Sequence, residues 1–335
     1  MDAHTNEAVL KEYEIENFDD SWNFENFKEK FSIVIQRVDR NCLEFDMIHI
    51  NAAITNALRR ILISEVPTLA IEKVFVYNNT SLLQDDFLAH RLGLIPIKVD
   101  PRYFEYRQEG DIEGTPQDTV VFDLKVKCVK NSNAETDAST PEKMYINRHV
   151  YSGQFKWLPI GSQAEMFREK PIKPVDDDIL IAKLSPGQEL DLKLHCVKGI
   201  GRDHIKFSPV ATAFYRLLPK IELTKKVKGE DIERLKQCFS KGVIGVKYEG
   251  EEGEREEVAT VIDSRLDSCG RNVFRHKHLK DSVKMSVIKD HFIFSVESTG
   301  ALPSNTLFLE ATKILTAKCR HFLGELEEIN NKIKK

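Results

Sequence analysis

"NAAITNALRRILISEVPTLAIE", residues 51–72, predicts an amphipathic helix followed by a strand, and it decides how the rest of the chain is interpreted. At about 100° per residue, one side of the helix carries only apolar side chains. This apolar stripe consists of Ile54, Ala57, Leu58, Ile61 and Leu62. Burying each large side chain contributes roughly 1.5–3 kcal/mol, which is enough to fix the helix against another surface. The helix is expected to stop at Pro67.

The opposite side of the same helix is not simply polar. Asn56, Arg59 and Arg60 share it with Ile63, a large β-branched residue. Single exposed apolar residues are common on monomers, so the isoleucine could lie there by chance. Alternatively, this face is a second protein contact, with Ile63 as its anchor and the arginines as hydrogen-bond donors. The pattern alone leaves both interpretations open.

A second long helix is predicted near the C-terminus, from about Pro303 to Ile329. Its apolar stripe consists of Leu307, Phe308, Ala311, Ile314, Leu315, Phe322, Leu326 and Ile329. This stripe is longer than a small domain needs to cover its own core, so the two helices together predict an obligate interface. Glu65 and Lys318 fall inside the stripes, where an unpaired charge is costly, and we expect them to pair with each other or with groups of a partner.

The remaining pattern is dominated by strands. Alternation on both sides of residues 39–41 predicts a hairpin, and residues 282–298 predict another that turns at Lys289-Asp290. Residues 120–130 and 189–199 also alternate, with His195 on the polar side, which indicates an antiparallel sheet with one solvated face. Residues 131–141 and 161–178 are interpreted as loops, and the run near residue 250 as a solvated acidic loop.

The two ends of the chain therefore have the same order, a hairpin followed by a helix. We expect an α+β fold in which the two ends form one discontinuous domain, residues 29–68 and 282–335. A β-rich domain, residues 69–281, would be inserted between them, and residues 1–28 would form a loosely structured acidic extension.

Composition excludes several classes of function. The formal net charge of −4 is unusual for a protein that grips DNA by its phosphates, so no independent sequence-specific DNA binding is expected. Charges interrupt every apolar run, and the N-terminus lacks a signal-peptide pattern, so no membrane contact is expected. The six cysteines form no CxxC pair, which argues against a zinc ribbon or a disulfide framework.

Two motifs keep other functions open. His276 and His278 could offer two metal ligands, and "GIGRDH" places glycines beside a histidine, but neither has the partners that a catalytic or phosphate-binding site requires. The basic strip "RNVFRHKHLK" could contact phosphates, although it is short. We therefore expect a non-catalytic scaffold without metal or cofactor.

Several ordered segments resemble the α-like subunits of DNA-dependent RNA polymerases. These segments are "NALRRILISEVPTLAIE", "NNTSLLQDDFLAHRLGLIPIKVD", "GIGRDHIKFSPVATAFYRLLP" and "HFIFSVESTGALP". The resemblance spans about residue 30 to the C-terminus. Within the family, the likeness is greatest to the larger α-like subunit that eukaryotic RNA polymerases I and III share. An α-like subunit of RNA polymerase II or of an archaeal-type enzyme is the alternative.

The resemblance implies a fold, partners and a location. The discontinuous domain would be a dimerisation domain whose striped helices pair with a smaller α-like subunit. Asn56, Arg59, Arg60 and Ile63 would dock this heterodimer onto the second-largest catalytic subunit, within an assembly that includes other small polymerase subunits. The chain would act in the nucleus, including the nucleolus, in the synthesis of ribosomal RNA precursor, 5S RNA and tRNA. The cysteine-rich zinc loop of the RNA polymerase II relative is missing from "KVDPRYFEYRQEGDIEGTPQD".

Overall fold

The computed structural model describes residues 23–108, 110–132, 144–249 and 256–333, and it has the mixed α+β fold that the sequence predicts. The chain divides into two compact units, each assembled from separated stretches of sequence. Of the described residues, the first unit comprises 23–36, 45–55, 215–249 and 256–294. The second comprises 37–44, 56–108, 110–132, 144–214 and 295–333. The domain boundaries predicted at residues 28, 68 and 281 stay a prediction.

One sheet has the strand order β1-β2-β16-β13. Its strands are β1 (Ser32–Val38), β2 (Cys42–Ile48), β13 (Val210–Leu223) and β16 (Val283–Ser298). The hairpin predicted around residues 39–41 is confirmed, since β1 and β2 are neighbours and the Asp39 N–H donates to the Cys42 carbonyl at 2.8 Å. Helix α2 (Phe24–Lys30) precedes β1, so the described end of the predicted loose extension is helical.

The second predicted hairpin is wrong. Residues 283–298 form the single strand β16, which passes through Lys289 and Asp290 without turning. A two-residue hairpin loop needs positive φ angles, and neither residue has one. Instead, the Asp290 carbonyl accepts the His49 N–H at 2.7 Å, and His49 Nδ1 lies 2.6 Å from the Asp290 carboxylate. Asp290 thus binds His49, the residue that follows β2, while β16 continues through this position without a break.

A second sheet has the order β3-β12-β5-β9 and antiparallel pairing throughout. Its strands are β3 (Thr68–Asn79), β12 (Glu189–Gly199), β5 (Thr119–Lys127) and β9 (Lys156–Leu158). Leu190, Leu192 and Leu194 are buried as their alternation predicts. Helix α4 (Asp85–Gly93) contributes the fully buried Leu88 and Leu92 to the core of this sheet. His195, by contrast, was expected on the solvated face and is only 6% exposed.

Short elements complete the second unit. Three pairs of short strands are β4 (Ile97–Lys98) with β10 (Lys173–Pro174), β8 (His149–Tyr151) with β11 (Leu180–Lys183), and β6 (Val129–Lys130) with β7 (Tyr145–Ile146). The short helix α6 (Gln163–Met166) follows β9 in the sequence. The 3₁₀ turns are η1 (Pro101–Tyr103), η2 (Ser152–Gln154) and η3 (Ile205–Phe207). The predicted loop at residues 161–178 therefore contains a short helix and a short strand. Most of the loop predicted at residues 131–141 lies outside the described residues.

The first unit has its own small core. A hairpin, β14 (Ile244–Glu249) and β15 (Glu256–Val261), accompanies α7 (Glu230–Cys238), η4 (Ser264–Leu266), η5 (Asn272–Arg275) and α8 (Lys277–Lys280). The core residues include Leu235, Val243 and Val273, all essentially fully buried. The basic strip of residues 271–280 thus folds into η5 and α8. The acidic loop predicted near residue 250 falls largely on residues 250–255, outside the described chain.

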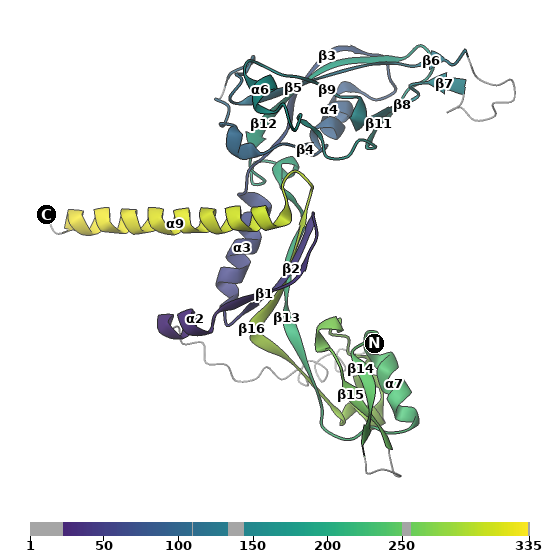
Figure 1. The fold of residues 1–335 in the computed structure, drawn as a ribbon, viewed down its shortest axis with the longest axis vertical. Coiled ribbons are helices and arrows are strands. Elements are labelled where there is room, and N and C mark those ends of the chain that lie inside the picture. The colour runs from purple at the N-terminus through teal and green to yellow at the C-terminus, as the bar shows by residue number, and fades with distance from the viewer. Residues whose placement is uncertain (1–22, 109, 133–143, 250–255, 334–335) are drawn as a thin grey trace, which may run out of the picture. The chain divides into compact units, whose positions relative to one another are not determined.

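Two helices carry the predicted stripes. Helix α3 covers Ala52–Ser64, and α9 covers Ser304–Ile333 (Figure 1). At 1.5 Å per residue, the 30 residues of α9 extend over roughly 45 Å. Among the described residues, the structure holds no helix that is both long and apolar enough to cross a membrane.

Candidate protein-interaction site

The stripe of α3 lies mostly inside the chain. Leu58 and Ile61 are each 3% exposed and Leu62 is fully buried, while Ile54 and Ala57 are half-buried. The apolar spacing therefore did identify a buried face. Other parts of the same chain bury Leu58, Ile61 and Leu62, so these three residues belong to the core of the structure.

Helix α9 changes character along its length. Leu307 and Ala311 are fully buried, and Phe308, Ile314 and Leu315 are partly buried. From residue 316 to residue 333, every residue is exposed. We call the apolar side chains of this second half the exposed stripe: Phe322, Leu326, Ile329 and Ile333, which are 63%, 56%, 50% and 76% exposed.

The exposed stripe has the character of an association surface. Soluble monomers rarely leave a continuous apolar surface uncovered, and such surfaces mark sites of association. Ile333 was not among the predicted residues, although its spacing of four from Ile329 places it on the same side of the helix. Leu323, 60% exposed, lies at the border of the stripe.

The expected pairing of Glu65 with Lys318 is confirmed. Lys318 Nζ donates to Glu65 Oε1 at 2.7 Å, which ties α9 to the segment that follows α3. The two side chains are 46% and 23% exposed, so the pair contributes only roughly 0.2–1 kcal/mol. The pair joins α9 to the end of α3 within the part of α9 where every residue is exposed.

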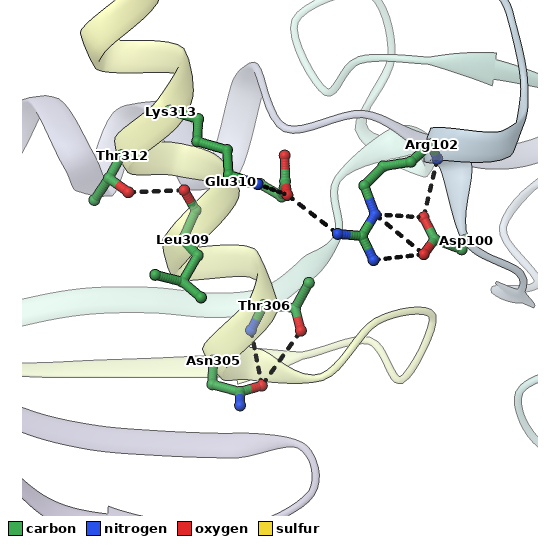
Figure 2. A network of polar contacts seen from close by, with 8 residues as sticks. All are labelled: Asp100, Arg102, Asn305, Thr306, Leu309, Glu310, Thr312 and Lys313. Atoms are coloured by element: carbon green, nitrogen blue, oxygen red, sulfur yellow. Dashed lines mark hydrogen bonds and ion pairs between the residues drawn. The ribbon is translucent and has the colours of Figure 1, made fainter.

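A further ionic network, which sequence analysis missed, holds α9 from another side (Figure 2). Arg102 Nε donates to Asp100 Oδ1 at 2.9 Å and Arg102 Nη2 to Asp100 Oδ2 at 2.6 Å. The remaining nitrogen, Nη1, lies 3.4 Å from Glu310 Oε1 on α9. Burial alone would raise the pKa of Asp100, but the hydrogen bonds and charge of Arg102 outweigh it and lower that pKa. No spacing or pattern in the sequence links positions 102 and 310.

The polar face of α3 is more accessible. Arg60 is exposed, and the half-buried Arg59 donates from Nε and Nη2 to Asn56 Oδ1 at 3.1 and 2.9 Å. Ile63 is half-buried, and the "GIGRDH" segment packs against the backbone at the end of the helix, where the Arg202 N–H donates to the Ser64 carbonyl at 2.9 Å. A Cβ on Gly201 would lie 2.2 Å from the Ile63 carbonyl oxygen, so only glycine permits this approach. The four predicted docking residues thus share one face, with Arg60 its most exposed member.

The residues considered for other chemistry do not form a catalytic constellation in the described part of the chain. His278 Nε2 lies 3.3 Å from Asp231 Oδ1, and the His276 and His278 rings are 5.9 Å apart. Among the described residues, no three His, Cys, Asp or Glu side chains are grouped closely enough to hold a metal ion. The six cysteines are free thiols, and burial raises the pKa of Cys196.

Comparison with known proteins shows the family of the chain. Residues 44–319 match the family model described as the RNA polymerase Rpb3/Rpb11 dimerisation domain. The chain is 56% identical to the mouse DNA-directed RNA polymerases I and III subunit RPAC1, over 93% of this chain and 89% of that protein. It is 44% identical to the RPAC1 subunit of Saccharomyces cerevisiae, over 90% of each chain. Similarity to the RNA polymerase II subunit rpb3 of Dictyostelium discoideum is lower, 28% over 88% of this chain and 94% of that protein.

Proposed function

The chain belongs to the RNA polymerase Rpb3/Rpb11 dimerisation domain family, and on this premise we propose that it is the non-catalytic α-like subunit shared by RNA polymerases I and III. Identity of 56% and 44% to subunits named for polymerases I and III, against 28% to a polymerase II subunit, favours this member of the family. Its role is assembly: it holds other subunits together and contributes no reacting group.

The exposed stripe of α9 is the observation that carries the proposal. It forms the contact with a smaller α-like subunit, and Phe322 is the predicted interface residue that is most available to it. The buried residues predicted for the interface, such as Leu58, Ile61 and Leu307, act indirectly, because they hold α3 and α9 in place within this chain. Partly buried residues such as Phe308 and Leu315 extend the contact toward the covered end of α9.

The second face of α3 docks the heterodimer onto the second-largest subunits of polymerases I and III. Arg60 supports this assignment because it is exposed, and Arg59 because Asn56 holds its guanidinium in a fixed orientation. A pre-oriented guanidinium loses little freedom on binding, which suits a docking contact. Within the assembly the chain also meets other small subunits, works in the nucleus including the nucleolus, and supports synthesis of ribosomal RNA precursor, 5S RNA and tRNA.

Purification of the tagged full-length chain from its own cells tests the proposal. At moderately high salt, we expect mass spectrometry to find the large subunits of polymerases I and III and a smaller α-like subunit in near-equal amounts. Recovery of polymerase II subunits instead would place the chain with another member of the family. Recovery of the chain alone would contradict the scaffold role.

Two substitutions separate the two faces. Phe322→Asp should abolish recovery of the smaller α-like subunit, whereas Arg60→Ala should keep it and reduce recovery of the large subunits. Leu309→Asp is the matched control for Phe322→Asp, since Leu309 is 59% exposed but lies about 140° around α9. If Arg60→Ala removes both kinds of subunit together, the assignment of separate faces is wrong.

A further inference from the structure

The segment that leads into α9 is fixed against the β-rich part of the second unit. Gly300 has φ +93°, and a Cβ there would lie 2.4 Å from Val175 Cγ1, so the turn packs its backbone directly on Val175. The Thr299 N–H and hydroxyl both donate to the Pro209 carbonyl, at 2.9 and 3.0 Å. The start of α9 is therefore not free to pivot about this turn.

Asp100 holds the guanidinium of Arg102 in a fixed orientation beside α9. In addition to the paired contacts with the guanidinium, the Asp100 carboxylate accepts the Arg102 N–H at 3.0 Å, and the buried Pro101 restricts the backbone between them. A carboxylate that binds an arginine through two nitrogens sets the plane of the guanidinium as well as its position. Nη1 is consequently directed at Glu310, although the Arg102 side chain as a whole is about half exposed (Figure 2).

Glu310 forms an ion pair with Arg102 near the point where the buried part of α9 ends. Its side chain is 20% exposed and also accepts Lys313 Nζ at 2.9 Å from the next turn. Ala311, the last fully buried residue of α9, is its neighbour, and the exposed half begins at residue 316. A small change of direction at Glu310 would be amplified along the helix, because the exposed stripe ends at Ile333, about 35 Å beyond it.

We propose that Arg102 is a positioning residue for the heterodimer: held by Asp100, it fixes the direction of α9 through Glu310 and so presents the exposed stripe in one orientation. This inference rests on the proposed function and deepens it, because it gives the β-rich part of the chain a role in partner binding. A chain whose α9 is correctly aimed for only a fraction of the time binds with an affinity reduced by that fraction. Arg102 keeps the fraction high without touching the partner.

Charge reversal followed by rescue tests this role. Binding of the full-length chain to the purified smaller α-like subunit is measured by stopped-flow mixing. Arg102→Glu would place three carboxylates together and should weaken binding roughly tenfold, mainly by slowing association. Dissociation should change little, since the partner itself holds α9 once it is seated. Arg102→Glu combined with Glu310→Arg should restore most of the association rate, and Arg102→Lys should lose about threefold.

The outcomes are distinguishable from loss of folding and from failure of the proposed function. Arg234→Glu is the matched control, because Arg234 also pairs with two acidic side chains on the surface, at 3.2 and 3.3 Å, but on α7 of the first unit. It should leave both rate constants unchanged, and thermal melting should report a folded chain for every variant. Normal binding by Arg102→Glu, or no rescue by Glu310→Arg, would overturn the inference. Failure of the unmodified chain to bind would overturn the heterodimer itself.

Discussion

His195 lies at a position that alternation assigns to the solvated face of β12, yet its surroundings bury it. The Phe75 ring meets it edge-on, with ring centroids 4.8 Å apart, and Nδ1 has no hydrogen-bond partner among the described residues. Burial lowers the pKa of His195 from its ordinary value of 6.5, and the positive charges of Arg107, Lys193 and Lys73 lower it further. The imidazole is therefore held neutral in the folded chain.

The buried imidazole predicts a loss of stability in mild acid. Because the folded pKa is below 6.5, the unfolded chain binds more protons, and the stabilisation present above about pH 6.5 is lost as the pH falls below that value. The slope from this group reaches at most about 1.4 kcal/mol per pH unit. Urea unfolding of the isolated chain at pH 7.5 and pH 5.5 should show a smaller difference for His195→Phe than for the unmodified chain. An equal difference would mean that His195 titrates normally.

The six thiols should differ widely in reactivity. Cys319 is exposed on α9, Cys42 and Cys269 are partly buried, and Cys128, Cys196 and Cys238 are buried. Since the thiolate is the reactive form, a raised pKa adds to steric protection at Cys196. A thiol reagent should therefore modify one cysteine rapidly, and Cys319→Ser should remove that phase. Addition of the smaller α-like subunit should slow the same phase, because Cys319 borders the exposed stripe; unchanged labelling in the complex would argue against contact there.

At the scale of elements, the spacing of apolar residues correctly predicted those strands and turns that depend on neighbouring residues in the sequence. The turn at residues 39–41 and the alternating faces of β5 and β12 followed from spacing of two along the chain. Lys289-Asp290 misled the same reasoning, because a polar pair within an apolar run resembles a turn unless its contact with His49 is known. The stripe of α3 was correctly recognised as buried, but the sequence could not tell burial within this chain from burial by a partner.

A substitution in the turn before α9 tests whether the packing of this turn sets the direction of the helix. Gly300→Ala would force a Cβ into Val175 at an unfavourable positive φ, so the turn must shift. We expect a loss of roughly 1–3 kcal/mol in unfolding free energy and weaker binding of the smaller α-like subunit. Gly187→Ala is the matched control, since Gly187 has φ +87° but open space at its Cβ. If both variants bind the partner equally well, the packing of the turn on Val175 does not set the direction of α9.

At the scale of the whole molecule, long-range pairs were the least predictable feature. Glu65 and Lys318 could be anticipated because each placed a charge inside an apolar stripe, which demanded a partner. Arg102 and Glu310 carried no such signal, since both occur among other charged residues. In addition, 207 residues lie between them in the sequence. Their meeting depends on how the β-rich segment folds back on α9, which no periodicity records.

The exposed stripe makes a final prediction about the isolated chain. A continuous apolar surface on the last half of α9 should drive self-association when no partner is present, because burying it removes apolar area from water. Sedimentation of the purified chain at increasing concentration should show a growing dimeric or larger fraction. Phe322→Asp combined with Leu326→Asp should keep the chain monomeric without lowering its melting temperature, since both side chains are more than half exposed. A chain that stays monomeric at tens of micromolar would mean that the stripe is covered within the molecule, and the smaller α-like subunit would then have to bind elsewhere.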